Sequence, residues 1–103
     1  MKKNKGKIQK GVAKKPLVNA PEEKIFWCTD GQVFRNIKDL SEGLSNMSDE
    51  TFAYHSNAEK HDFSNWLMGV LEEVKLANEL AKPITRQEAA GVTRSVVLLF
   101  NLT

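Results

Sequence analysis

Apolar and polar positions divide the chain into two parts at about residue 24. Residues 1–24 hold few apolar side chains, and these do not recur at the period of a helix or a strand. Lysines, two glycines and two prolines separate them. A segment of this composition cannot bury enough apolar surface to offset the entropy lost on ordering. We therefore expect residues 1–24 to form a disordered tail.

The first regular pattern is the stretch KIFWCTDGQVFRN at residues 24–36, which predicts a β-hairpin. Two short runs rich in aromatic and β-branched residues flank Asp30 and Gly31. This dipeptide suits a type I′ turn, which needs positive φ at both central residues. Because a two-stranded hairpin is not stable alone in water, it has to pack on helices.

The aromatic residues of this hairpin have two interpretations. We favour the interpretation that Phe26, Trp27 and Phe34 belong to the core, with Trp27 facing Trp66 across the hairpin and a helix. They could instead form an exposed platform on which nucleic-acid bases stack. Cys28, with no neighbouring base in the sequence, is expected to be a small buried apolar residue.

Helical patterns follow the hairpin. Asn36 and Ser48 are good N-caps for two short helices. Residues 62–74 give the strongest helix, because apolar residues recur there over a wide face at i, i+3, i+4, i+7, i+8 and i+11. The next segment, KLANELAK, either continues this helix or begins a new one after a bend, and Pro83 ends it.

The last helix begins at a capping box formed by Thr85 and Glu88. Ala89, Val92, Val96 and Phe100 could line one of its faces. The run VVLLF at residues 96–100 also fits a strand, because a short apolar run does not distinguish the two.

These elements predict an α+β fold that is mostly α-helical. The hairpin packs on three or four short helices, residues 25–103 form one small domain, and the disordered basic tail precedes it. A chain of 103 residues has room for one domain. The chain has no run of about 18 apolar residues, the length that a membrane-spanning helix needs. Its single cysteine fits a reducing compartment. We expect a cytoplasmic protein.

Charge is distributed as unevenly as apolar surface. Residues 1–24 carry eight lysines and two glutamates, a net charge of +6. Residues 25–103 carry seven basic and eleven acidic residues, a net charge of −4. A basic tail on an acidic body indicates contact between the tail and a polyanion. The tail could equally serve only to keep the chain in solution.

The stretch FAYHSNAEKHDFSNW at residues 52–66 holds both histidines of the chain. Two ligands on one helix face would be three or four residues apart, whereas His55 and His61 are six apart. A turn could still join them, with Glu59 and Asp62, in a metal site, and His55 with Asp62 could form an acid/base pair. We favour a structural corner between two helices. Its expected members are Phe52, His55, Asp62, Phe63 and Trp66.

Much of this chain resembles a small prokaryotic domain family that is frequent in archaea. Members of that family read as an aromatic pair, a D-G or N-G turn, an L-x-x-L helix and the motif MSDExFxYHxNxExNDFxxW. The resemblance covers most of residues 25–90. The matching positions are Phe26, Trp27, Asp30, Gly31, Leu40, Leu44, Met47, Ser48, Phe52, Tyr54, His55, Asn57, Asp62, Phe63 and Trp66.

The resemblance implies little about activity, because no activity is established for the family. It does affect the metal hypothesis. The family usually has Asn where this chain has His61, and Asn is a poor zinc ligand but a good N-cap. The resemblance thus implies that His61 is a substitution at a helix start, with Asp62 taking over the cap or the favourable position in the helix dipole.

The function predicted from these patterns is that of a non-enzymatic accessory protein that associates with RNA, DNA or a ribonucleoprotein particle. The alternative is a protein-interaction module that uses the acidic helical body. We find no nucleophile elbow, Gly-rich phosphate loop or paired carboxylates, and no indication of a cofactor or small-molecule substrate. The expected nucleic-acid-binding residues are Lys2, Lys3, Lys5, Lys7, Lys10, Lys14 and Lys15.

Overall fold

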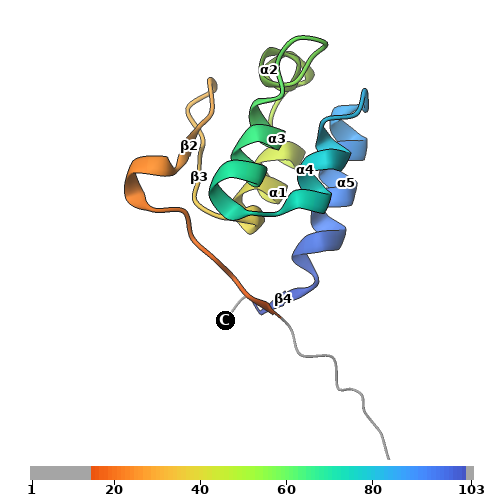
Figure 1. Cartoon of the computed structure of the whole chain (residues 1–103). Coiled ribbons are helices and arrows are strands. Elements are labelled where there is room, and N and C mark those ends of the chain that lie inside the picture. Colours follow the sequence, from red (N-terminus) through yellow and green to blue (C-terminus); the bar gives the residue numbers. More distant parts are fainter. Residues whose placement is uncertain (1–14, 102–103) are drawn as a thin grey trace, which may run out of the picture.

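The computed structural model describes residues 15–101. The predicted fold class is confirmed: a short hairpin packs against five helices (Figure 1). In chain order the elements are β1 (Lys15–Pro16), the 3-10 turn η1 (Glu22–Lys24), β2 (Phe26–Trp27), β3 (Val33–Phe34), α1 (Ile37–Asn46), α2 (Asp49–His55), α3 (Asp62–Trp66), the π-helical turn η2 (Leu67–Leu71), α4 (Val74–Leu80), α5 (Arg86–Val97) and β4 (Phe100–Asn101).

Residues 15–24, which belong to the predicted tail, pack on the body of the protein. Within the predicted tail, β1 pairs in parallel with β4, and Ala20 is buried where its N–H donates to the carbonyl of Arg35 at 2.7 Å. Leu17 packs against the core. The prediction failed here because the partners of these residues lie near the other end of the chain, and a composition argument cannot detect such pairing. Residues 1–14 lie outside the described part.

The hairpin forms as predicted, but with a different turn. Gly31 has φ of 96°, and Asp30 does not have the positive φ that a type I′ turn requires. The N–H of Cys28 donates to the carbonyl of Gln32, and the N–H of Gly31 donates to the carbonyl of Cys28. The connection is therefore a three-residue loop with Gly31 in the left-handed region. Asp30 favours it by accepting hydrogen bonds from the backbone and side chain of Gln32.

Local hydrogen bonds start three helices where the sequence predicts them. Asn36 accepts from the N–H of Asp39, and Ser48 accepts from the N–H of Thr51. The capping box of α5 is complete, with both of its hydrogen bonds present. At the C-terminal end of α1, a distant side chain and not a local cap pairs the last backbone carbonyls, which accept hydrogen bonds from the guanidinium of Arg86.

The helix predicted over residues 62–74 is shorter than expected. It widens into η2 and stops at Glu72, whose φ of 59° is left-handed. The N–H of Glu73 donates to the carbonyl of Leu67, which closes this end. Val74, expected on the buried face, starts α4 in a new direction and is exposed. The alternative of a new helix after a bend is the one that holds.

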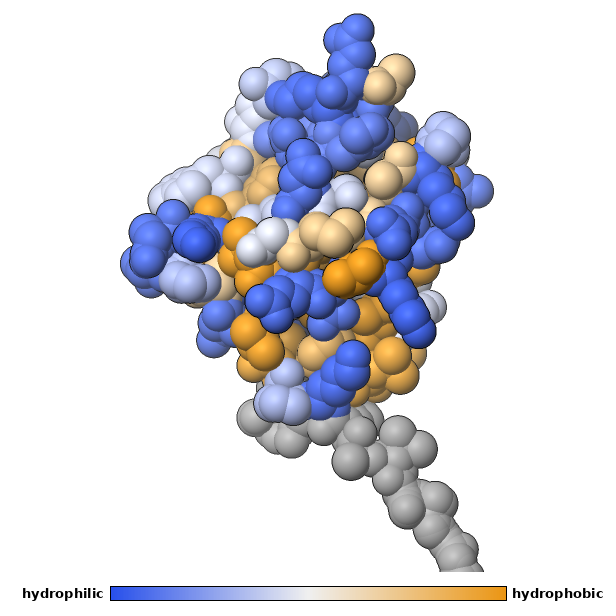
Figure 2. Space-filling view, in the orientation of Figure 1, coloured by the Kyte–Doolittle hydropathy of each residue, from blue (hydrophilic) through white to orange (hydrophobic). Residues whose placement is uncertain are grey.

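The C-terminal run combines both predicted alternatives. Val96 and Val97 belong to α5, whereas Phe100 belongs to β4 and is buried. Leu98 and Leu99 lie at the change of direction and are exposed. Figure 2 shows hydrophilic residues gathered over α2 at the top of this face, while apolar residues reach the surface toward the lower end, near β4.

The core joins the hairpin to the helices through aromatic rings. Phe26 and Phe34 stack at a centroid distance of 5.7 Å, and Phe26 also contacts Phe63 and Trp66. Trp66 is buried, and its Nε1–H donates to the carbonyl of Lys24. The prediction that Trp27 faces Trp66 is wrong, since Trp27 is 71% exposed. Adjacent strand residues point to opposite faces, so burying Phe26 turns Trp27 outward.

A Gly43→Ala substitution should destabilise the protein by roughly 1–3 kcal/mol, the usual cost of overpacking a filled core. A Cβ at Gly43, inside α1, would overlap the ring of Phe34. Gly91→Ala is the matched control, because nothing lies within 4 Å of its Cβ position on α5. It should stabilise the helix by about 0.5–1 kcal/mol. Urea unfolding of both variants checks this, and an equal effect of the two would contradict it.

Truncation should separate residues 1–14 from residues 15–24. A chain that starts at Lys15 should unfold within about 2 °C of the full chain, since it loses only lysine-rich sequence. A chain that starts at Ile25 loses β1, Ala20 and the carbonyl that binds Trp66. Its midpoint should fall by at least about 5 °C, on the order of 1 kcal/mol. Equal midpoints by thermal unfolding would show that residues 15–24 contribute nothing.

Candidate functional site

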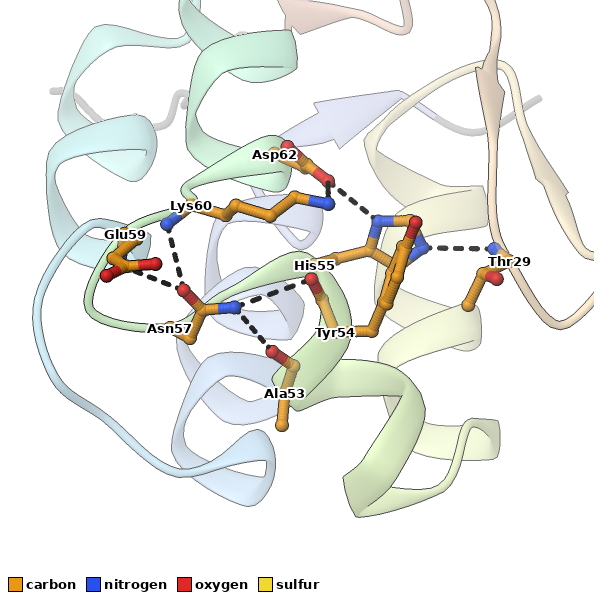
Figure 3. Close-up of polar contacts among 8 residues, drawn as sticks. All are labelled: Thr29, Ala53, Tyr54, His55, Asn57, Glu59, Lys60 and Asp62. Atoms are coloured by element: carbon orange, nitrogen blue, oxygen red, sulfur yellow. Dashed lines mark hydrogen bonds and ion pairs between the residues drawn. The ribbon is translucent and has the colours of Figure 1, made fainter.

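The side chain of Asn57 organises the loop between α2 and α3, together with a backbone hydrogen bond from the N–H of Asn57 to the carbonyl of Lys60. Its Oδ1 accepts hydrogen bonds from the N–H groups of Glu59 and Lys60 at 2.8 and 3.0 Å. Its Nδ2 donates to the carbonyl of Ala53 near the end of α2 (Figure 3). Asn57 therefore ends one helix and returns the chain toward the next. This turn places residue 62 beside residue 55.

His55 uses both ring nitrogens in hydrogen bonds. Its Nε2 lies 3.0 Å from the backbone nitrogen of Thr29 in the hairpin loop, and its Nδ1 lies 2.9 Å from Oδ2 of Asp62 (Figure 3). A backbone N–H can only donate, so Nε2 has to be the unprotonated acceptor. The proton then sits on Nδ1 and is donated to the carboxylate. One neutral imidazole thus joins the hairpin, α2 and the start of α3.

Aromatic rings enclose this imidazole. Phe26 and Phe63 have ring centroids 5.2 and 5.3 Å from that of His55, and Tyr54 covers it edge-on at 5.0 Å. Only 5% of His55 is exposed. A general base needs a free nitrogen within reach of a substrate, whereas both nitrogens of this ring are occupied. The arrangement fits a structural pair.

Lys60 closes the outer side of the pair. Its Nζ lies 3.3 Å from Oδ2 of Asp62 and 4.0 Å from the centroid of the Tyr54 ring. It partly neutralises the carboxylate that accepts from His55 and places a cation over an aromatic face. The stretch that holds the sequence-predicted pair therefore carries four interacting side chains. The spacing of the histidines gave no signal for Lys60.

His61 does not join His55. It occupies the position before α3 without capping it, since its side chain makes no cap hydrogen bond and its Nδ1 is buried without a partner. Asp62 lies in the first turn of α3, but its carboxylate points to His55. Within residues 15–101, no group of three His, Cys, Asp or Glu side chains could hold a metal ion.

His61 instead lines a groove that the sequence did not indicate. A pocket of about 490 Å³ lies between the α2–α3 loop and the connection from α4 to α5. A second hollow of about 340 Å³ continues along α2 and shares Ser56 and Ile84 with the first. One wall comes from residues 56–61 and the other from residues 81–84, so no local sequence pattern could predict the groove. The first pocket is lined by Ser56, Asn57, Ala58, His61, Ala81, Lys82, Pro83 and Ile84.

The remaining predicted residues are placed as follows. Phe52, Phe63 and Trp66 are buried around the His55 corner. Cys28 is buried, and burial raises the pKa of its thiol, which disfavours a reactive thiolate.

Lys15 is the single member of the predicted lysine set that the structure describes. It belongs to β1, with its Nζ 5.6 Å from the centroid of the Phe100 ring. The other predicted binding lysines, Lys2, Lys3, Lys5, Lys7, Lys10 and Lys14, lie outside the described residues.

Comparison of the chain with protein-family models, with curated proteins and with solved structures gives no match. The resemblance to the prokaryotic family therefore stays a prediction.

Replacing His55 by Ala should lower the free energy of unfolding by roughly 1–3 kcal/mol, because the substitution leaves the N–H of Thr29 and the carboxylate of Asp62 without their partner. His61→Ala is the matched control and should cost less than about 1 kcal/mol, since the ring makes no cap hydrogen bond. Denaturant unfolding measures both. Equal losses, or a stoichiometric metal whose chelation unfolds the protein, would contradict the structural role.

Proposed function

We propose that this protein is a non-enzymatic accessory protein that associates with nucleic acid, or with a ribonucleoprotein particle, through its N-terminal lysines. The observation that carries the proposal is the separation of charge. Residues 1–14 carry six lysines and no acidic residue, whereas residues 15–103 carry nine basic and thirteen acidic residues, a net charge of −4. Clustered lysines bind phosphates through the release of condensed counterions, without reading sequence.

The fold sets the point at which this basic segment joins the body. Pairing of β1 with β4 holds Lys15 on the side of the molecule opposite to α2 (Figure 1). Lys15 is exposed beside Phe100, with its Nζ 5.6 Å from the ring centroid, and the other six predicted lysines lie in residues 2–14. The acidic body repels a polyanion, which limits contact to the basic segment and to any uncharged interaction that the body supplies.

The non-enzymatic part of the proposal draws on the chemistry of the buried groups. His55 has no free nitrogen, and Cys28 is a buried thiol with a raised pKa.

Along the described part of the chain, no helix is long and apolar enough to cross a membrane.

The groove beside α2 favours a second function, that of a protein-interaction module. Its two hollows follow one another along the helix, as sites for successive side chains of a bound segment do. Phe52 and Ile84 contribute apolar surface, while Asp49 and Arg86 form an ion pair at one end. In this case the basic segment would be incidental to the function.

Binding of RNA and DNA should be weak, largely independent of sequence and steeply dependent on salt. If about three to five of the six lysines engage at once, the slope of log K against log salt should be roughly −2 to −4.5. A chain that starts at Lys15 should lose this binding. Fluorescence anisotropy of labelled single-stranded RNA and DNA, measured at several salt concentrations with both chains, provides the test.

A chain of the same length with Lys2, Lys3, Lys5, Lys7, Lys10 and Lys14 replaced by Gln is the control that keeps the segment and removes its charge. It should behave like the truncated chain. Tight binding by the truncated chain, or no salt-sensitive binding by the full chain, would refute the proposal. The second result would leave the interaction module as the better function.

A further inference from the structure

Trp27 is a large aromatic residue at the surface of a well-held hairpin. The residue before it, Phe26, is locked between Phe34, Phe63 and Trp66. The hydrogen bond from the N–H of Cys28 to the carbonyl of Gln32 fixes the strand on its other side. Its backbone is thus pinned on both sides, while 71% of the residue is exposed. Exposing a tryptophan on a rigid support gains nothing for folding, which makes it a candidate contact residue.

The neighbours of Trp27 on the outer face of the hairpin form a support for its ring. Trp27 lies opposite Val33, and because the next pair, Cys28 and Gln32, is hydrogen-bonded, Trp27 and Val33 form the close non-hydrogen-bonded pair. Val33 is partly buried against the core. Arg35, which follows the end of β3, is exposed. Val33 therefore provides an apolar neighbour for the indole across the strand pair.

We propose that Trp27 is a stacking platform for a base of single-stranded nucleic acid held by the N-terminal lysines. This inference rests on the proposed function and adds to it the class of nucleic acid. A base in a duplex is already stacked on its neighbours, whereas an unpaired base can place its face on an indole. Duplexes would thus use the lysines alone, and single strands would use the lysines and Trp27.

Charge supports the division of roles between the two regions. Near Trp27 in sequence, Lys24 and Arg35 are opposed by the exposed acids Glu22, Glu23 and Asp30. The hairpin therefore offers phosphates no net attraction of its own. Segment 15–24 joins the basic residues to the hairpin, and Ala20 ties it to the carbonyl of Arg35. A strand that binds the lysines can follow this segment toward Trp27, where stacking carries no charge requirement.

Intrinsic fluorescence of the full chain tests this inference, because the two tryptophans differ in exposure. Oligo(dT) of about 15 nucleotides, a length within the range of known single-strand sites, should quench the red-shifted emission of exposed Trp27 and leave the emission of buried Trp66 unchanged. A duplex of the same length should bind without this quenching. Trp66→Phe isolates the Trp27 signal, and Trp27→Ala should show no quenching of the remaining tryptophan.

Affinity separates stacking from charge. Trp27→Ala should weaken binding to oligo(dT) by roughly 5- to 100-fold, leave duplex binding unchanged, and leave the salt slope unchanged, because no phosphate contact is lost. Trp27→Phe, which keeps a ring, should lose less. The substitution is at an exposed position, so the variant should fold, and circular dichroism is the check for that.

Two results overturn the inference while leaving the proposed function intact: salt-dependent binding of oligo(dT) without Trp27 quenching, or equal weakening of single-strand and duplex binding by Trp27→Ala. The first would show that the bound strand does not contact Trp27. No binding of either nucleic acid by the full chain refutes the proposed function, and this inference fails with it.

Discussion

The neutral imidazole of His55 is the interaction on which the arrangement of the hairpin and the helices depends. It accepts from the backbone of Thr29 and donates to Asp62, so it can serve both partners only as the Nδ1–H tautomer. An imidazolium would place a proton against the N–H of Thr29. The two hydrogen bonds join segments that are 26 and 7 residues from His55 in sequence. Such a buried group is costly unless both sides are satisfied, and here both are.

Contacts between aromatic rings and between helices join the remaining elements to the hairpin and α2. Phe26 reaches from the hairpin into the rings around His55, and Phe34 continues from the hairpin to Gly43 on α1. From α1 the contact passes to α5, where Arg86 binds the last carbonyls of α1. Ser64 on α3 donates to the carbonyl of Ala77 on α4, which joins the remaining pair. The α1–α5 and α3–α4 joints thus add side-chain hydrogen bonds to backbone carbonyls, and the carbonyl of Ala77 also accepts from the N–H of Ala81. Such bonds supplement apolar contact in a core of modest size.

The same constraint that builds the core determines what the surface offers. Because Phe26 has to point inward, Trp27 has to point outward, and a tryptophan that contributes little to the core becomes available for contact. Tyr54 and Lys60 cover the corner at His55, and both nitrogens of its imidazole are hydrogen-bonded. The imidazole therefore has no free nitrogen with which to exchange a proton with a substrate. The surface features that could serve the proposed binding function are the basic segment, the outer face of the hairpin and the groove beside α2.

The sequence by itself determined the features that depend on neighbouring residues. The caps at Asn36, Ser48 and Thr85 form where predicted because each hydrogen bond spans three residues. The segregation of lysines from acids follows from the order of residues in the chain and needs no structure. The joining of His55 and Asp62 across a turn was also accessible, since Asn57 supplies the turn within the same short stretch.

Only the tertiary structure decided which hairpin face is buried, where the helix after residue 62 stops, and that β1 pairs with β4. Alternation places Phe26 and Trp27 on opposite faces but does not say which face meets the helices, because both are apolar. The left-handed conformation of Glu72 has no local residue that demands it; it lets α4 pack back on α3. Pairing of Lys15 with Phe100 joins residues 85 positions apart, and no pattern within either segment records a partner at that distance.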